Sequence, residues 1–345
     1  MSNLLEIIQP DDWHIHFREG DMLELVANFS SRINNRCVAM PNTIDPITTY
    51  DKAKIYKDQI KKLSYKNFEP LIPCYLKEDL DIGNFREGLK NKYFFGAKLY
   101  PSDATTNSKF GVSDISKIYY LLEILEQMQH PLLIHGEKVS RDIDIFDREK
   151  FFIDDELTII RDKFPNLKIT LEHVTTAHGV HFIKQNNNIG GTITPHHMLL
   201  TKDDVFIEDS INPHHYCMPV AKNESDLIEL RNAACHDNSK FFLGTDSAPH
   251  PIEDKSIGLL SKPGIFSAPC SIELYAEIFE QENAINNLEI FSSINGAKFY
   301  GFTQNESKIR LQKTEWTIPE FSELNNKTLP LTASYSGFLS KNSFI

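Results

Sequence analysis

The segment DDWHIHFR, residues 11–18, places two histidines one residue apart in an apolar and aromatic run. In a β-strand, side chains two residues apart point to the same face, so His14 and His16 would face one interior together. Two unpaired imidazoles in an apolar interior are costly, and a shared metal ion would satisfy both. As an isolated pair they are explained equally well as core histidines that donate to nearby carbonyls.

Further polar side chains of metal-binding and anion-binding types occur where other apolar runs end. If these runs are parallel strands of a barrel, their carboxyl ends meet at the face where barrel enzymes form active sites. Metal-ligating types come from five of eight runs, which favours a metal centre over isolated core histidines. The residues are His14, His16, Arg18, Asn42, Lys98, His135, His173, Asp246 and His250.

Lys98, in the segment GAKLY, is the unusual member of this set. Without other context, such a lysine is most often a partly buried stem with a solvated ammonium group. An ammonium group is repelled by nearby divalent cations, however, and a buried lysine tends to lose its proton. A neutral amine can add carbon dioxide to form a carbamate, which is an anionic ligand able to bridge two metal ions.

Eight short apolar runs, each followed by a polar turn with Gly or Pro, would position these residues. Most gaps hold segments with helical spacing of apolar residues, for example 21–33, 115–129 and 155–164. Strands that alternate with amphipathic helices predict a parallel sheet covered by helices. Eight such units predict an α/β fold of the (β/α)8 TIM-barrel type, with a doubly wound open sheet as the alternative. The runs are 13–17, 36–42, 70–76, 95–101, 131–137, 168–174, 190–197 and 241–250.

The barrel pattern ends near residue 303, and no repeat, low-complexity tract or linker divides the chain before that point. The segment IRLQKTEWTIPEF, residues 309–321, has the pattern of short strands. We therefore expect a barrel over residues 1–303 and a small C-terminal extension over 304–345, which packs on the barrel and is not an independent domain.

Composition restricts the possible partners. The chain has 345 residues, of which 41% are hydrophobic, and its formal net charge is −12 at pH 7. This charge, without any basic run, disfavours nucleic acid and anionic membranes, and an anionic small molecule would need a locally basic pocket. Five scattered cysteines without CxxC spacing indicate a reducing compartment. Because secretory and membrane-spanning patterns are also missing, we expect a cytoplasmic protein without a membrane partner.

A series of motifs resembles a known family. The motifs are DDWHIHFREG, VAMPNT, GAKLYPSDATTN, LLIHGE, LEHVTT, YCMPVAK and FLGTDSAPH, and NGAKFYG also fits, near residue 301. Together they resemble the bacterial-type, monofunctional dihydroorotases of the amidohydrolase superfamily. HxH alone indicates only the superfamily, whereas GAKLYP with ATTN, followed by LGTDSAPH, is much more specific. The resemblance implies a β/α barrel, a homodimer and two zinc ions in each subunit.

The resemblance also implies which residues bind the two zinc ions. Imidazole and carboxylate are both accepted zinc ligands, and paired metals suit hydrolysis because one activates water while the other polarises a carbonyl. The implied ligands are His14, His16 and Asp246 for the first ion, His135 and His173 for the second, and carboxylated Lys98 together with a hydroxide as bridges.

Substrate contacts are implied in the same way. Arg18 suits a substrate carboxylate because its planar guanidinium can pair with both oxygens, although a surface salt bridge is the commoner role of an arginine. The segment 102–111 would be a mobile lid, with an ordinary polar loop as the alternative. The implied substrate residues are Arg18, Asn42 and His250 at the carboxylate, Met218 and Pro263 at the ring through their backbones, Thr105 and Thr106 on the lid, and His135.

The implied activity is the reversible, zinc-dependent cyclisation of N-carbamoyl-L-aspartate to L-dihydroorotate in de novo pyrimidine (UMP) biosynthesis. In the hydrolytic direction, the bridging hydroxide attacks the ring amide carbonyl. Asp246 takes the hydroxide proton and delivers it to the leaving nitrogen, because the proton lost in attack is needed at departure.

Two other functions remain possible from the sequence. Another cyclic-amide hydrolase, such as a hydantoinase or allantoinase, would share HxH and the lysine but would not need Arg18, Asn42 and His250 together. A non-catalytic scaffold would typically lose metal ligands, whereas all six candidate positions are present. One segment, 251–266, departs from relatives in which it is rich in Cys and Gly, and Pro263 there can offer only its carbonyl.

Overall fold

In this computed structural model, the described residues are 4–208, 210–237, 239–255, 261–314, 321–324, 327–330 and 343–344. Within them, no helix is long and apolar enough to cross a membrane.

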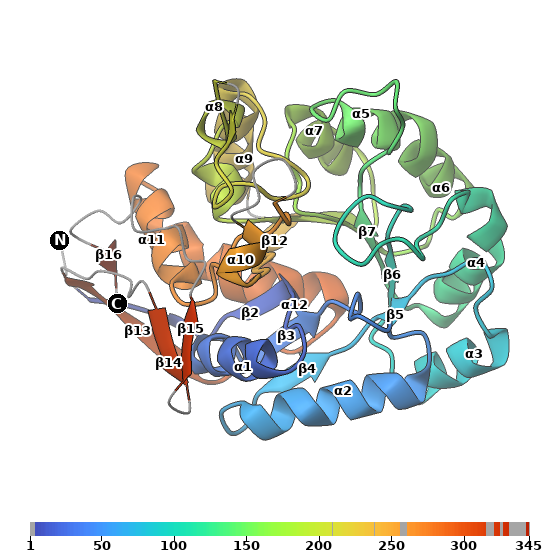
Figure 1. Ribbon diagram of the computed structural model, residues 1–345, viewed down its shortest axis with the longest axis horizontal. Helices are drawn as coiled ribbons and strands as arrows, with labels where there is room; N and C mark the ends of the chain where they lie inside the picture. The colour runs from blue at the N-terminus through green and yellow to red at the C-terminus, as the bar shows by residue number, and fades with distance from the viewer. Residues whose placement is uncertain are drawn as a thin grey trace.

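The centre of the molecule is a parallel barrel whose strands follow one another in chain order (Figure 1). β4 pairs with β3 and β5 pairs with β6, so these two short strands are the halves of one interrupted barrel strand. The strands are β2 (Asp11–Ile15), β3 (Arg36–Ala39), β4 (Glu69–Leu71), β5 (Cys74–Tyr75), β6 (Ala97–Leu99), β7 (Leu132–His135), β8 (Ile169–Glu172), β9 (Ile189–Ile193) and β12 (Phe241–Leu243). Each of the eight predicted apolar runs overlaps one of these strands or, for 70–76, both halves.

The barrel closes between its first strand and the segment that follows its last strand. Ile15 forms a parallel bridge with Ser247. The backbone amide of Asp246 donates to the carbonyl of His14 at 2.9 Å, and the amide of His16 donates to the carbonyl of Ser247 at 3.0 Å. These bonds confirm the predicted closed barrel over the open doubly wound sheet.

Helices cover the outside of the barrel (Figure 1). The predicted helix 21–33 is α1. The predicted helix 115–129 is a 3-10 turn over 115–118 followed by α4. The predicted helix 155–164 lies in a continuous helical run from α5 through a π-turn to α6. The principal helices are α1 (Asp21–Ile33), α2 (Tyr50–Leu63), α3 (Ile82–Lys90), α4 (Tyr119–Met128), α5 (Arg148–Phe152), α6 (Thr158–Lys163), α7 (Ala177–Gln185), α9 (Glu224–His236), α11 (Ser271–Gln281) and α12 (Asn295–Tyr300).

Packing against α12 sets the orientation of β2. The buried Trp13 ring lies 4.6 Å from the ring of Tyr300 in α12, measured between centroids. Gly296 makes this approach possible, because a Cβ at that position would lie 2.0 Å from Trp13 Nε1. Trp13 also clusters with Val38, Leu133 and Phe242 of three other barrel strands. The register of β2 against β3 shifts between Asp12 and Ile15, so this part of the strand is irregular.

A buried ion pair joins β2 and β3 to the chain beyond the barrel. The Arg36 guanidinium donates to the two carboxylate oxygens of Asp11 at 2.9 and 2.6 Å and to the carbonyl of Thr303 at 3.0 Å. Asn305 also donates to Asp11, at 2.9 Å. The segment at which the barrel pattern ends is therefore held by a paired, buried charge.

Short strands outside the barrel involve both ends of the described chain. β1 (Leu4–Ile8) pairs antiparallel with β13 (Lys308–Thr314), and β13 also pairs with β16 (Ser343–Phe344). β14 (Phe321–Leu324) pairs with β15 (Lys327–Pro330). The predicted short strands after residue 308 are thus present, although 315–320 lie outside the described residues. β1 was not predicted, because its partner is some three hundred positions away and leaves no local pattern.

Candidate metal centre and active site

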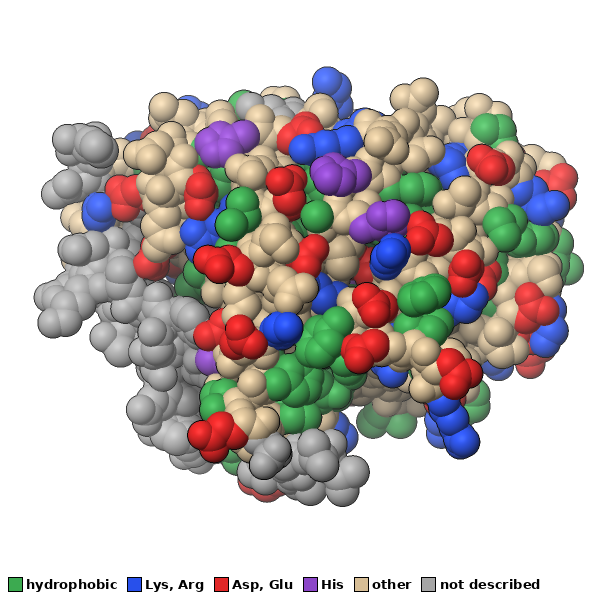
Figure 2. All heavy atoms as spheres, turned by 90° about the horizontal axis from the view of Figure 1, so that it is seen from above, with side chains coloured by type: hydrophobic (Ala, Val, Ile, Leu, Met, Phe, Trp, Pro, Cys, Tyr) green, Lys and Arg blue, Asp and Glu red, His purple; other side chains and the backbone are tan. Residues whose placement is uncertain are grey.

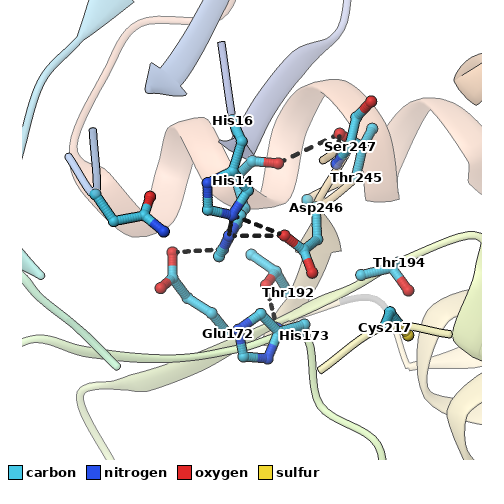
Figure 3. A network of polar contacts seen from close by, with 12 residues as sticks. His14, His16, Glu172, His173, Thr192, Thr194, Cys217, Thr245, Asp246 and Ser247 are labelled. Carbon is cyan, nitrogen blue, oxygen red and sulfur yellow. Dashed lines mark hydrogen bonds and ion pairs between the residues drawn. The ribbon is translucent and has the colours of Figure 1, made fainter. Parts of the chain in front are cut away.

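Predicted strand-end residues meet in the interior at one end of the barrel, and Figure 3 shows His14, His16, His173 and Asp246 pointing toward one another. They come from opposite ends of the sequence because β2 and β12 are adjacent in the closed barrel. His14 belongs to β2, Lys98 to β6 and His135 to β7, while His173 directly follows β8 and Asp246 comes three residues after β12. All five side chains are buried.

Asp246 connects the two histidines of the HxH motif. Its Oδ1 lies 3.2 Å from His14 Nε2 and 3.1 Å from His16 Nε2. The two imidazoles face the same space, with 3.4 Å between their Nε2 atoms. The same-face geometry expected for residues i and i+2 of a strand is therefore present.

His135 and His173 form the second half of the cluster. Their ring centroids are 4.7 Å apart, and the His173 ring lies 5.1 Å from the ring of His14. The backbone amide of His173 donates to the hydroxyl of Thr192 at 2.7 Å. His135 Nε2 lies 2.7 Å from a carboxylate oxygen of Glu137.

Glu172 is a site residue that the sequence analysis missed. One of its oxygens lies 2.9 Å from His14 Nδ1 (Figure 3). The other oxygen contacts the ammonium group of Lys98. Residues 172 and 173 would point to opposite faces of a regular strand. Glu172 faces the interior in register with His135, and the left-handed backbone of His173, with φ of 41°, brings the next side chain to the same centre. A carboxylate inside the apolar run KITLEHV was the available signal.

Burial and carboxylates oppose each other in setting the charges of the cluster. Burial lowers the pKa of His14, but Glu172 and Asp246 outweigh it and raise this pKa to about 9. His16 lacks a second carboxylate, so burial lowers its pKa to about 4. Burial alone would raise the pKa of Asp246, yet the two histidines hold it well below its usual range. The pKa of Lys98 is lowered by burial, although the Glu172 carboxylate opposes this effect.

These residues fit a bound metal ion. His14, His173 and Asp246 offer ligand atoms that all lie within 4.8 Å of one another. His173 Nδ1 is buried and has no hydrogen-bond partner among the described residues. A buried imidazole nitrogen without a partner is costly, and coordination to a metal ion would satisfy it.

Arg18 and His250 lie together at the mouth of the same interior. Arg18 Nε donates to the carbonyl of Pro249 at 3.1 Å, and its Nη2 lies 3.1 Å from His250 Nε2. Arg18 has φ of 58°, so its backbone adopts a left-handed conformation that is uncommon for a residue with a long side chain. Burial, and after it the charge of Arg18, lowers the pKa of His250 to about 2, so His250 is neutral beside the guanidinium.

The loop 102–111 reaches the same pocket through Asn42. The Asn42 amide nitrogen donates to the carbonyl of Thr106 at 2.9 Å, and Asn107 donates back to the carbonyl of Asn42 at 3.0 Å. The loop is therefore tied to β3's end in this conformation, and its motion as a lid stays a prediction. The pocket is lined by His14, His16, Arg18, Asn42, Tyr100, Thr105, Thr106, His135, His173, Met218, Asp246, Ala248, Pro263 and Gly264.

A second group of ligand-type side chains, His196, His197 and Cys217, lies nearby and is buried. His197 already uses both ring nitrogens, which lie 2.8 Å from the hydroxyl of Thr194 and 2.9 Å from the carbonyl of Pro219. The Cys217 thiol donates to the same carbonyl at 3.3 Å. These contacts explain His197 and Cys217 as hydrogen-bonded core residues.

Comparisons with known proteins agree with this arrangement. A profile of the amidohydrolase family matches residues 7–314. A dihydroorotase of Hahella chejuensis is 43% identical over 334 residues, which are 95% of each chain, and a dihydroorotase of Coxiella burnetii is 43% identical over the same share of both chains. A solved dihydroorotase of Campylobacter jejuni is 35% identical, with a TM-score of 0.87 and coverage of 100% of this chain and 98% of that one.

The chain belongs to the amidohydrolase family. Within that family it groups with the dihydroorotases. A solved dihydroorotase of Saccharomyces cerevisiae, in complex with 5-fluoroorotic acid, is 31% identical, with a TM-score of 0.88 and coverage of 99% of this chain and 97% of that one. An L-hydantoinase of Arthrobacter aurescens, at 15% identity and a TM-score of 0.74 over 92% of this chain and 78% of that one, shows the shared fold alone. Membership of this family implies a metal cofactor, in agreement with the buried ligand cluster.

Proposed function

We propose that this protein is a dihydroorotase, a hydrolase of cyclic amides that interconverts L-dihydroorotate and N-carbamoyl-L-aspartate. The observation that carries this proposal is the position of Arg18. Its guanidinium lines the same pocket as His14, His16, His173 and Asp246. A metal-type cluster with a neighbouring fixed guanidinium suits a substrate that carries both a cyclic amide and a carboxylate.

The metal cofactor that we propose is a pair of zinc ions. When bound, zinc acts as a Lewis acid that lowers the pKa of water and polarises a carbonyl oxygen. The buried Lys98 amine is suited to carboxylation, because burial favours its neutral and nucleophilic form. We assign His14, His16 and Asp246 to one ion, His135 and His173 to the other, and N6-carboxylated Lys98 and a hydroxide as bridges.

Asp246 is the residue that we assign to proton transfer. Its carboxylate lines the pocket, and the neighbouring histidines hold its pKa well below its usual range, so it is ionised and can accept a proton. In ring opening it takes a proton from the attacking water and returns it to the leaving amide nitrogen. In ring closure the same carboxylate moves the proton in the reverse direction.

The remaining pocket residues would bind and orient the substrate. Arg18, with Asn42 and His250, would hold the carboxylate, and the backbones of Met218 and Pro263 would contact the ring. Thr105 and Thr106 lie on the loop tied to Asn42 and would exclude water above the substrate. Because Pro263 already receives a contact from His250 Nε2 at 2.9 Å, its carbonyl is held at the pocket wall.

The resemblance supports a wider proposal for this chain. We expect a barrel over residues 1–303 with an extension over 304–345, a homodimer, and a cytoplasmic role in de novo pyrimidine biosynthesis.

On the face shown in Figure 2, acidic and basic side chains are interspersed, so that this face carries charge of both signs.

The test of the proposed function is a ring-opening assay with purified, zinc-loaded protein. L-dihydroorotate, dihydrouracil and hydantoin would be compared, and cyclisation of N-carbamoyl-L-aspartate would be followed in the reverse direction. We expect turnover of dihydroorotate to be at least ~10²-fold above that of the rings without a carboxylate, because those rings cannot make the charge-assisted hydrogen bonds. Equal turnover of all three rings would instead indicate a hydantoinase, and no turnover of any would refute the proposal.

A further inference from the structure

Lys255 is a buried cation that the proposed mechanism does not use. It ends the short helix α10 (Ile252–Lys255) and is 1% exposed. Its ammonium group donates to three backbone carbonyls, those of Tyr216 at 3.2 Å, Lys262 at 3.0 Å and Gly264 at 2.7 Å. An ammonium group has three donors, so these three contacts use all of them.

The three carbonyls belong to the two backbone segments that we assign to the substrate ring. Tyr216 precedes Met218 by two residues, and Lys262 and Gly264 are the neighbours of Pro263 on either side. Met218, Pro263 and Gly264 all line the pocket that contains Asp246. The two segments touch directly as well, since the amide of Gly264 donates to the carbonyl of Tyr216 at 2.9 Å. Lys255 therefore joins both walls of the ring site from behind.

The buried position of Lys255 carries an energetic cost. The three groups that accept from it are neutral carbonyls, and burial lowers the pKa of the ammonium group to about 8. Burying a cation without a carboxylate partner opposes folding. An apolar side chain at this position would leave three carbonyls without their donor and would remove the link between the two backbone segments.

We propose that Lys255 is a positioning residue for the dihydroorotate ring, acting through the backbones of Pro263 and Met218. This inference rests on the proposed function. By fixing the distance between the two walls, Lys255 keeps backbone donors and acceptors aligned with the edge of a planar ring. Because it contacts neither the metal-type cluster nor the reacting atoms, its loss raises KM and leaves kcat and the bound metal nearly unchanged.

Lys240 provides a matched control. Its ammonium group also donates to three carbonyls, those of Ile183, Lys184 and Asn186, at 2.8, 3.0 and 2.5 Å. Lys240 directly precedes β12, at the end of the barrel opposite the pocket. Lys240→Met thus removes the same kind and number of hydrogen bonds without touching a wall of the ring site.

The experiment measures kcat and KM for L-dihydroorotate, together with bound zinc and thermal unfolding, in the wild type, Lys255→Met and Lys240→Met. We expect Lys255→Met to raise KM by about tenfold or more with kcat within about threefold, and Lys240→Met to keep KM within about twofold while both lower the unfolding temperature. If Lys255→Met does not fold, Lys255→Arg keeps the charge but not the three-way geometry, and the same rise in KM is expected.

Two outcomes would overturn the inference and can be told apart. The positioning role alone would be refuted if the wild type turns over dihydroorotate and the Lys255 variants have the same KM as the wild type. It would also be refuted if the variants lose kcat and bound zinc instead of showing a higher KM. A zinc-loaded wild type that does not turn over dihydroorotate would refute the proposed function, and the role of Lys255 with it.

Discussion

Replacing Arg18 by methionine tests how the pocket selects its substrate. The guanidinium is fixed before substrate arrives, since Nε is bonded to the carbonyl of Pro249 and Nη2 lies beside neutral His250. Among the described residues, Nη1 has no hydrogen-bond partner, so this edge can face a carboxylate. Methionine keeps a similar apolar stem and removes every donor, so the change isolates the charged group.

The expected loss follows from the hydrogen bonds that a carboxylate would make. Two charge-assisted bonds of about 1.5–2 kcal/mol each give ~3–4 kcal/mol. Since each 1.36 kcal/mol changes a rate tenfold, kcat/KM for dihydroorotate should fall by about 10²–10³-fold. The preorganised guanidinium loses little conformational entropy on binding, so most of this interaction energy contributes to selectivity.

The assay compares L-dihydroorotate with its uncharged carboxamide in the wild type and Arg18→Met. The two substrates share the ring, so the cycle isolates the interaction between Arg18 and the carboxylate. We expect the variant to lose about 10²–10³-fold on dihydroorotate and less than about threefold on the carboxamide. Arg310→Met, at an arginine that is 71% exposed and paired with Glu6, is the control and should match the wild type. Equal losses on both substrates would refute the carboxylate role and leave Arg18 as a structural residue.

Three further predictions concern the cluster and the barrel. Asp246→Asn should lower kcat by about 10³-fold or more while bound zinc is retained, because the proton carrier is lost, and near-full turnover with both metals bound would exclude this role. Removing metal with a chelator should abolish turnover, and added zinc should restore it in parallel with metal content; an apo protein with undiminished turnover would contradict a metal-dependent mechanism. Arg36→Ala should lower the free energy of unfolding by about 3–5 kcal/mol in urea titrations, because Asp11 is left buried and unpaired, whereas kcat should change less than about twofold; a loss below about 1 kcal/mol would contradict this assignment.

The fold was predictable because its signal is local and repeated. Each buried strand produces an apolar run, and each covering helix produces apolar residues at helical spacing, so eight units indicate the barrel before any contact is known. The interruption between β4 and β5 was not predicted, although Pro73 lies in the gap and has no amide hydrogen to donate to a ladder. The pairing of β1 with β13 joins distant segments, and no local pattern could have indicated it.

The site was predictable to the extent that strand ends determine position. His14, His16, His135, His173 and Asp246 were expected together because parallel strands bring their carboxyl ends to one face, and the structure places them there. Glu172 was missed, although it pairs in register with His135 in the neighbouring strand and faces the interior by regular alternation. His173 was predicted, but it shares this interior only because its left-handed backbone breaks the alternation of the strand.

The closing seam of the barrel and the proposed metal centre are made from the same residues. Asp246 donates its backbone amide to the carbonyl of His14 and offers its carboxylate to the imidazole of the same residue. Immediately before them, Asp12 accepts from the amide and hydroxyl of Thr245 at 2.9 and 2.6 Å. The first and last strands thus supply ligands to one centre only when the barrel is closed. An ion bound there favours the closed barrel by linkage, because the unfolded chain has no preformed site. Substitutions at the seam, such as at Asp12, should therefore lower stability and metal affinity together, whereas a change in the pocket wall should weaken substrate binding and leave metal affinity unchanged.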